Sequence, residues 1–118
     1  MPRTKTPEEL LPLTPSVFHI LLALSEGERH GYAIMQEVAA RTGGKLRLGP
    51  GTLYGSIKRM IADGLIEERE QRSASAEDER RRYYRLTQLG RKVAVAETAR
   101  VESLFKQARS AGLAPKRV

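Results

Sequence analysis

Apolar residues recur at helical spacing in three successive segments of the first half of the chain. They predict helices over residues 14–27, 31–41 and 51–63, separated by breaks that contain glycine. The third predicted helix has one apolar face at positions i, i+4, i+7 and i+8: Leu53, Ile57, Met60 and Ile61. Gly64 follows this helix, where a glycine in the left-handed conformation commonly ends a helix.

Two strands and a long helix are expected in the second half. Residues 65–69 and 80–87 have strand patterns, and the charged segment 70–79 between them predicts a hairpin loop. A final helix over residues 88–112 has about 25 residues, or ~37 Å at 1.5 Å per residue. This length exceeds the body of such a small domain, so its apolar stripe predicts a homodimer interface, with a frayed tail as the alternative. The predicted interface residues are Val93, Ala96, Val101, Leu104, Phe105 and Ala108.

This order of elements predicts a mainly α fold with a small β-hairpin: a winged helix-turn-helix plus a long C-terminal helix. Residues 1–13 are expected to form a flexible N-terminal arm, because three prolines there restrict the preceding residues away from helix. Residues 14–87 then form the winged helix-turn-helix domain. Residues 88–112 form the dimerisation helix, and residues 113–118 a disordered tail.

Composition narrows the classes of partner and compartment. The 118 residues suffice for one domain, and 21 Lys and Arg against 14 Asp and Glu give a formal charge of +7. This surplus favours a polyanionic partner, nucleic acid first and an anionic membrane second. The absence of cysteine excludes disulfides, thiolate zinc sites and cysteine catalysis. No apolar run is long enough for a membrane span or a signal core, so we expect a cytoplasmic location and no membrane partner.

No residue cluster indicates catalysis or a metal site. His19 and His30 lie far apart in sequence, and no Ser–His–Asp order, His-Glu-x-x-His motif or carboxylate pair is present. The glycines around Gly51 lack the spacing of a dinucleotide-binding or phosphate-binding loop. We therefore expect neither an enzyme nor a cofactor.

The polar face of the third predicted helix suits the major groove of DNA. Small residues allow close approach, Arg and Lys reach base edges or phosphates, and hydroxyls donate to phosphates. An ordinary solvated helix face is the alternative for this helix taken alone. The candidate DNA-binding residues of this helix are Thr52, Tyr54, Gly55, Ser56, Lys58 and Arg59.

The predicted hairpin adds a cluster of arginines that suits the neighbouring minor groove or its phosphates. Its candidate DNA-binding residues are Arg80, Arg81 and Arg82. The acidic run at residues 77–79 lies beside them and can pair with them in the free protein. Such neutralisation favours a second hypothesis, a winged-helix protein–protein interaction module without specific DNA binding.

Four short motifs in this order resemble the PadR family of bacterial transcriptional regulators over about residues 14–108. They are His30-Gly31-Tyr32-Ala33-Ile34, Pro50-Gly51-Thr52-Leu53-Tyr54, Asp63-Gly64-Leu65-Ile66 and the run from Arg82 to Gly90. The resemblance implies a homodimeric repressor that reads a palindromic operator, with the third helix in the major groove and the wing on the flanking minor groove. Thr52, Tyr54, Ser56 and Lys58 match the DNA-facing positions of the family, and residues 80–82 match its wing.

The resemblance also implies how the subunits meet. In this family the last helix dimerises with help from the first, and a single C-terminal helix marks the short subtype. Some members bind a small aromatic effector near the dimer interface. In this chain the aromatic residues near that expected interface are Phe18 and Phe105.

Overall fold

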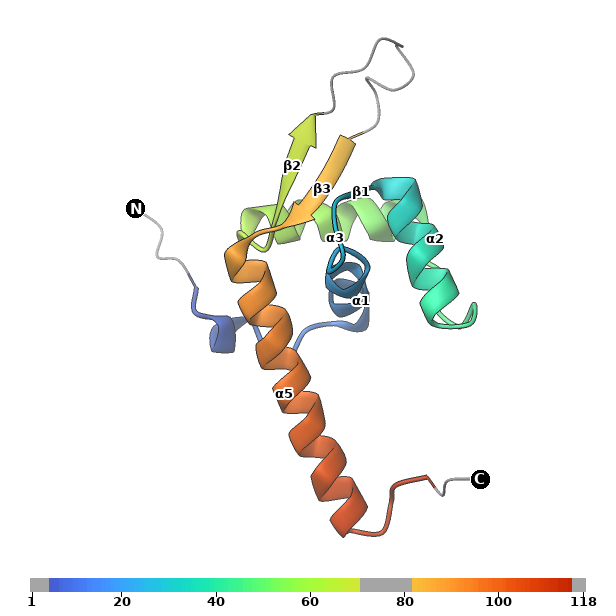
Figure 1. Ribbon diagram of the computed structural model, residues 1–118, viewed down its shortest axis with the longest axis vertical. Coiled ribbons are helices and arrows are strands. Elements are labelled where there is room, and N and C mark those ends of the chain that lie inside the picture. The colour runs from blue at the N-terminus through green and yellow to red at the C-terminus, as the bar shows by residue number, and fades with distance from the viewer. Residues whose placement is uncertain (1–4, 71–81, 116–118) are drawn as a thin grey trace.

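Three short helices and a small antiparallel sheet form a body from which one long helix projects (Figure 1). This computed structural model describes residues 5–70 and 82–115. The elements in chain order are η1 (Pro7–Leu10), α1 (Pro15–Ala23), β1 (Arg29–His30), α2 (Gly31–Arg41), α3 (Pro50–Ala62), β2 (Ile66–Glu70), β3 (Arg82–Leu86) and α5 (Gln88–Ser110). The sheet has the order β1-β3-β2, with β3 antiparallel to both neighbours. The predicted fold, a winged helix-turn-helix followed by a long helix, is confirmed.

The strand β1 was not predicted from the sequence. Its two residues pair with Tyr84 and Tyr83 of β3. A two-residue strand is too short to show the alternation of side chains on which strand prediction depends. It extends the hairpin into a three-stranded sheet and anchors the start of α2.

The N-terminal segment is structured over residues 5–13, where a flexible arm was expected. Thr6 caps η1, and its hydroxyl oxygen accepts from the Glu9 amide at 3.4 Å. Burial explains the difference, because leucines of this segment pack against the core: Leu10, Leu11 and Leu13. Residues 1–4 of the expected arm and residues 116–118 of the expected tail lie outside the described residues.

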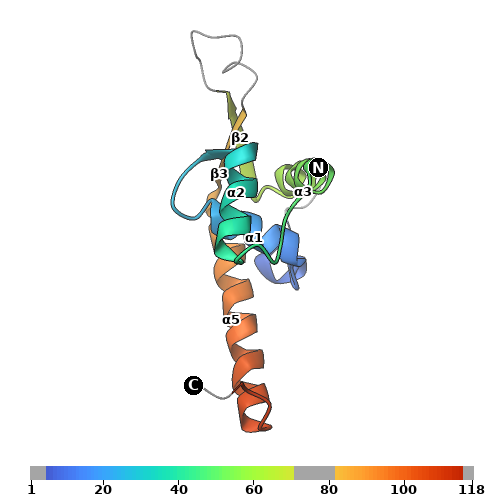
Figure 2. The same ribbon diagram turned by 90° about the vertical axis from the view of Figure 1, so that its right-hand side faces the viewer.

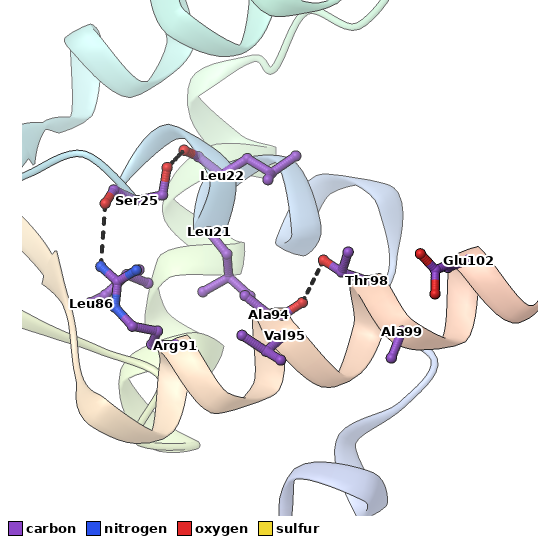
Figure 3. A pocket seen from close by; sticks show the side chains of 10 residues that line it. All are labelled: Leu21, Leu22, Ser25, Leu86, Arg91, Ala94, Val95, Thr98, Ala99 and Glu102. Atoms are coloured by element: carbon purple, nitrogen blue, oxygen red, sulfur yellow. Dashed lines mark hydrogen bonds between the residues drawn. The ribbon is translucent and has the colours of Figure 1, made fainter.

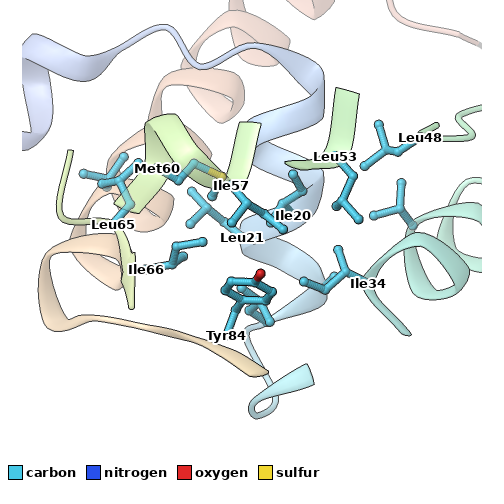
Figure 4. Packing of buried hydrophobic residues seen from close by; sticks show 14 residues of the cluster. Ile20, Leu21, Ile34, Leu48, Leu53, Ile57, Met60, Leu65, Ile66 and Tyr84 are labelled. Atoms are coloured by element: carbon cyan, nitrogen blue, oxygen red, sulfur yellow. The ribbon is translucent and has the colours of Figure 1, made fainter. Parts of the chain in front are cut away.

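The core lies where α1, α2 and α3 meet the inner face of the sheet (Figure 4). Ile20 and Leu21 of α1, Leu53 of α3 and Val93 of α5 are fully buried. The ring of Tyr84 lies against the same cluster from the sheet side (Figure 4). Burial, with a smaller contribution from the Glu68 carboxylate, raises the pKa of the Tyr84 hydroxyl, so this group stays neutral in the core.

The start of α5 is fixed by close contact with the loop after α3. Thr87 Oγ1 donates to the Gly64 carbonyl at 2.5 Å and accepts from the Gly90 amide at 2.9 Å. A Cβ atom on Gly90 would lie 1.9 Å from the Leu65 carbonyl oxygen, so only glycine fits at this crossing.

One stripe of α5 begins in the core and continues beyond it. Gly90, Val93 and Glu97 are buried against the domain. Spacings of three and four residues extend the same stripe along the helix to Val101, Leu104 and Ala108. Val101 and Leu104 are 44% and 49% exposed. Figures 1 and 2 both show the second half of α5 projecting beyond the other elements.

Candidate nucleic-acid interface

The helix α3 presents one face to solvent while its other face is buried. It packs against α1, α2 and β2 through its apolar residues. Thr52, Tyr54, Lys58 and Arg59 are exposed, and Gly55 is partly exposed. Five of the six residues predicted for the DNA-facing side of the third helix are therefore exposed or partly exposed.

Ser56 departs from that prediction. The sequence analysis named it as a DNA-binding candidate on the polar face, but Ser56 is fully buried. Contacts on several sides widen the buried part of α3 beyond the stripe of Leu53, Ile57 and Met60. Arg59 Nη2 lies 3.4 Å from the Ser56 hydroxyl oxygen, which accepts its hydrogen bond. Because it is buried, the Ser56 hydroxyl lies inside the fold rather than on the exposed face.

Tyr54 is held in place by the start of α2. A Cβ atom on Gly31 would lie 2.5 Å from the Tyr54 hydroxyl oxygen, so the tyrosine side chain rests directly on that glycine. The preceding residue, His30, caps α2 by accepting the Ala33 amide on Nδ1 at 3.1 Å, and its ring meets Tyr83 edge-on at 5.6 Å. The motif His30-Gly31 therefore positions a side chain of α3.

Tyr32 is a residue that the sequence prediction missed. It follows Gly31 directly at the start of α2 and is 61% exposed. A large aromatic residue with that exposure, next to the contact between α2 and Tyr54, adds a hydroxyl to the exposed surface. The sequence showed Tyr32 only as part of the His30–Ile34 motif, and the motif does not reveal whether a side chain is exposed.

The N-terminus of α3 lacks a side-chain cap. Gly49 is the N-cap residue, and no side chain accepts a hydrogen bond there. In the other helices of the described ranges, Thr6, Thr14, His30 and Thr87 each accept a backbone amide of the first turn. Because Gly49, Gly51 and Thr52 are exposed, the free amides of this turn are open to an anion.

Charge is distributed differently on α3 and on the hairpin. The helix α3 contains no acidic residue, and no carboxylate in residues 5–69 or 82–115 lies within ion-pair distance of Lys58 or Arg59. In the hairpin, Arg82 Nη1 lies 2.6 Å from Glu68 Oε1, and Arg85 Nε lies 2.6 Å from Glu67 Oε1. The helix therefore offers positive charge without a partner, whereas the base of the hairpin is paired.

Two of the three predicted hairpin contacts lie outside the described residues: Arg80 and Arg81. The acidic run at 77–79 lies outside them as well. Arg82 is described, and its side chain is 54% exposed beside Glu68.

The predicted interface residues of α5 divide into two groups. Val93 is fully buried in the core of its own chain, so the expectation that it faces a partner is wrong. Phe105 is 48% exposed, and the Arg109 guanidinium lies 5.5 Å from its ring centre. Ala96 lines a groove between η1 and α5. Val101, Leu104 and Ala108 continue the core stripe as described above.

A second groove of about 350 Å³ lies between α1 and α5 (Figure 3). Leu21 and Leu22 line it from α1, and Val95 and Ala99 line it from α5. Arg91 closes one end by donating to the Ser25 carbonyl at 3.2 Å. No aromatic side chain lines this groove, and Phe18 and Phe105 are not part of it.

Neither a metal site nor a membrane-spanning helix is found among the described residues. No three His, Cys, Asp or Glu side chains among them are grouped so that they could hold a metal ion. None of the helices in the described ranges combines the length and apolarity needed to cross a membrane.

Known proteins that resemble this chain include transcriptional regulators. Residues 20–96 match the Transcriptional regulator PadR-like family. The chain is 37% identical over 89 residues to Transcriptional regulator Rv3488 of Mycobacterium tuberculosis, a match that covers 75% of this chain and 78% of that protein. It is 38% identical over 74 residues to an uncharacterized 37.1 kDa protein in transposon TN4556 of Streptomyces fradiae. That match covers 63% of this chain and 19% of the longer protein.

A solved structure extends the comparison to the fold. The crystal structure of a PadR family transcription regulator from Clostridium difficile R20291 is similar with a TM-score of 0.70 at 25% identity. The similarity covers 82% of this chain and 97% of that one. The match over residues 20–96 spans most of the chain. This chain therefore belongs to the PadR-like family of transcriptional regulators.

Proposed function

We propose that the protein is a homodimeric repressor that binds a palindromic operator in double-stranded DNA. In each half-site α3 enters the major groove, and the hairpin between β2 and β3 lies on the flanking minor groove. The PadR-like family is a family of transcriptional regulators, and the protein is not an enzyme.

The observation that carries this proposal is the exposed face of α3. Thr52, Tyr54, Lys58 and Arg59 share solvent exposure, and the helix contains no carboxylate that would repel phosphates. Its uncapped first turn adds backbone amides for a phosphate. A helix approaches base edges closely when small residues lie near its N-terminus and cationic residues lie further along it.

The uncovered stripe of α5 supports the homodimer. The stripe of α5 that contains the buried Val93 continues beyond the domain as the apolar residues Val101, Leu104 and Ala108. Phe105 lies beside this stripe. An apolar stripe of this length is stable in water when a second apolar surface covers it. Antiparallel or crossed packing of two copies of α5 would cover both stripes and relate two α3 helices by a two-fold axis, which matches a palindrome.

The paired arginines of the hairpin favour the alternative, a winged-helix module that binds a protein partner instead of specific DNA. Glu67 and Glu68 already neutralise Arg85 and Arg82, so these arginines must lose ion pairs before they contact phosphates. On this alternative, the positive charge of α3 would meet an acidic protein surface.

Selection of bound DNA from a random-sequence pool separates the two functions. The repressor proposal expects an enriched motif with two-fold symmetry at moderate salt. An unenriched pool would instead support the protein-binding module. Lys58→Ala in the same selection should reduce recovery of the motif, which ties the result to α3.

A further inference from the structure

Residues 5–13, called the brace below, join α3 to α5. At one end, Lys5 Nζ lies 3.9 Å from Asp63 Oδ1, one residue after α3 ends. At the other end, the Leu13 amide donates to Glu97 Oε2 of α5 at 3.2 Å. Between these points η1 packs beside α5 (Figure 1). The brace therefore contacts both α5 and the residue that ends α3.

The contact at Glu97 is buried and fully paired. Glu97 is 2% exposed. Its carboxylate accepts from Arg100 Nε at 2.5 Å and Arg100 Nη2 at 3.0 Å, besides the Leu13 amide. A buried carboxylate is costly unless its oxygens are satisfied, so the Leu13 amide of the brace adds to the stabilisation that Arg100 gives this carboxylate. The hydrogen bond from Arg100 lowers the pKa of Glu97 despite its burial, so the group is charged at neutral pH.

Glu97 occupies the point where α5 leaves the domain. Within residues 82–115 it is the last buried residue, and the next positions of the same stripe, Val101 and Leu104, are exposed. The contacts at Gly90 and Val93 lie in the first two turns of α5. A tether at Glu97 therefore acts closer to the free half of the helix than these contacts do.

We propose that Glu97 is a positioning residue that locks the brace onto α5 and fixes the angle between α5 and α3. This inference rests on the proposed function, because a dimer formed through α5 converts that angle into the distance between its two α3 helices. Glu97 thereby sets the half-site spacing that the dimer accepts, without contacting DNA.

Distance measurement between spin labels tests this role in the full-length protein. The chain has no cysteine, so single cysteines can be labelled cleanly. Gln36→Cys on α2 and Ser110→Cys at the end of α5 are both at exposed positions. The doubly labelled chain, diluted with unlabelled protein, reports the direction of α5 within one subunit. Gln36→Cys alone reports the distance between the two domains of a dimer.

Glu97→Ala is the test variant, and Glu102→Ala is its matched control. Glu102 is on the same helix and pairs with Lys106 at 3.6 Å, but both side chains are more than 60% exposed. We expect narrow distance distributions in the unaltered protein and in Glu102→Ala, with broadened and shifted distributions in Glu97→Ala. Equal widths in Glu97→Ala and the unaltered protein would overturn the proposal, as would equal broadening in both variants.

Two further readouts keep the result interpretable. If Glu97→Ala loses its helical circular dichroism, Glu97→Gln replaces it, because this variant keeps the size of the side chain but removes the negative charge that pairs with Arg100 and weakens the hydrogen bond from the Leu13 amide. Broadening in Glu97→Gln relative to Glu102→Gln then supports the proposal, and its absence contradicts it. Broadening within one chain, without any distance between chains, would support the role of Glu97 and overturn the dimer.

Discussion

Lys58 and Arg59 carry the positive charge of α3, and their surroundings differ. Arg59 folds back along the helix, with Nη2 at 3.4 Å from the Ser56 hydroxyl and Nη1 near Gly55. Lys58 has no ion pair with any carboxylate in the part of the chain that the structure describes. Lys58 is therefore the residue whose removal changes the charge of the face with the least effect on the fold.

Lys58→Ala should weaken binding to the selected operator by about 1–3 kcal/mol if the lysine contacts bases. If it contacts a phosphate instead, the slope of the logarithm of the binding constant against the logarithm of the salt concentration should become less steep by about one. Gel-shift titration at several salt concentrations measures both effects. Lys106→Ala on the projecting half of α5 is the control, and equal losses in the two variants would remove Lys58 from the interface.

Gly90→Ala should destabilise the protein by about 1–3 kcal/mol, because the added Cβ meets the Leu65 carbonyl in a packed crossing. Gly51→Ala, in the open first turn of α3, is the control, and it should leave stability unchanged or raise it by up to about 1 kcal/mol. Urea unfolding of both variants gives the difference. A Gly90→Ala protein as stable as the Gly51→Ala protein would show that α5 does not cross the loop so closely.

At the scale of elements, the hairpin is built as a set of cross-strand ion pairs. Glu67 lies opposite Arg85 in the register, and Glu68 reaches diagonally to Arg82. Arg69 Nη1 also lies 3.4 Å from Glu28 Oε2 in the loop before β1. Exposed pairs of this kind add little stability, so their main effect is on the electrostatic field that DNA meets.

The double variant Glu67→Gln, Glu68→Gln should bind non-operator DNA more tightly, by about fivefold at most for each pair removed. The free energy of unfolding of this variant should change little, because exposed ion pairs add little stability. Binding to a non-specific duplex at low salt provides the measurement, with Glu102→Gln as the control. Unchanged affinity would mean that the hairpin base does not approach DNA.

The acid stability of α5 should depend on Glu97. Because the folded-state pKa of Glu97 is lowered from its ordinary 4.5, its charge stabilises the fold fully above that pH and loses this effect as the pH falls through the lower value. Glu97→Gln should therefore be less stable than the unaltered protein at neutral pH, and the difference should shrink below pH 4.5. Urea unfolding from pH 7 to pH 3 gives both curves; a constant difference would contradict this linkage.

The sequence allowed the helices, the hairpin and most of the exposed face of α3 to be predicted, because periodicity and caps are local. Thr14 and Thr87 both cap the helices that were expected after them. The burial of Ser56 on α3 and of Val93 on α5 depends on which other elements pack around each helix. The spacing of apolar residues along a helix contains no information about these neighbours. The structured brace escaped prediction because its leucines follow no helical or strand period.

At the scale of the whole molecule, the proposed dimer would present two copies of the exposed face of α3 to one DNA duplex. The domain presents α3 on one side, and the free half of α5 projects from the body (Figures 1 and 2). One domain alone gives a small contact surface, whereas two domains held by α5 double it and fix its symmetry. Specific binding is therefore expected to require the dimer.

Hydroxyl-radical footprinting on the selected operator tests this central claim most directly. A dimer with one α3 in each half-site predicts two protected regions related by a two-fold axis, with centres about 10 base pairs, or one helical turn, apart or a multiple of this. A single protected region, or protection without symmetry, would contradict the account.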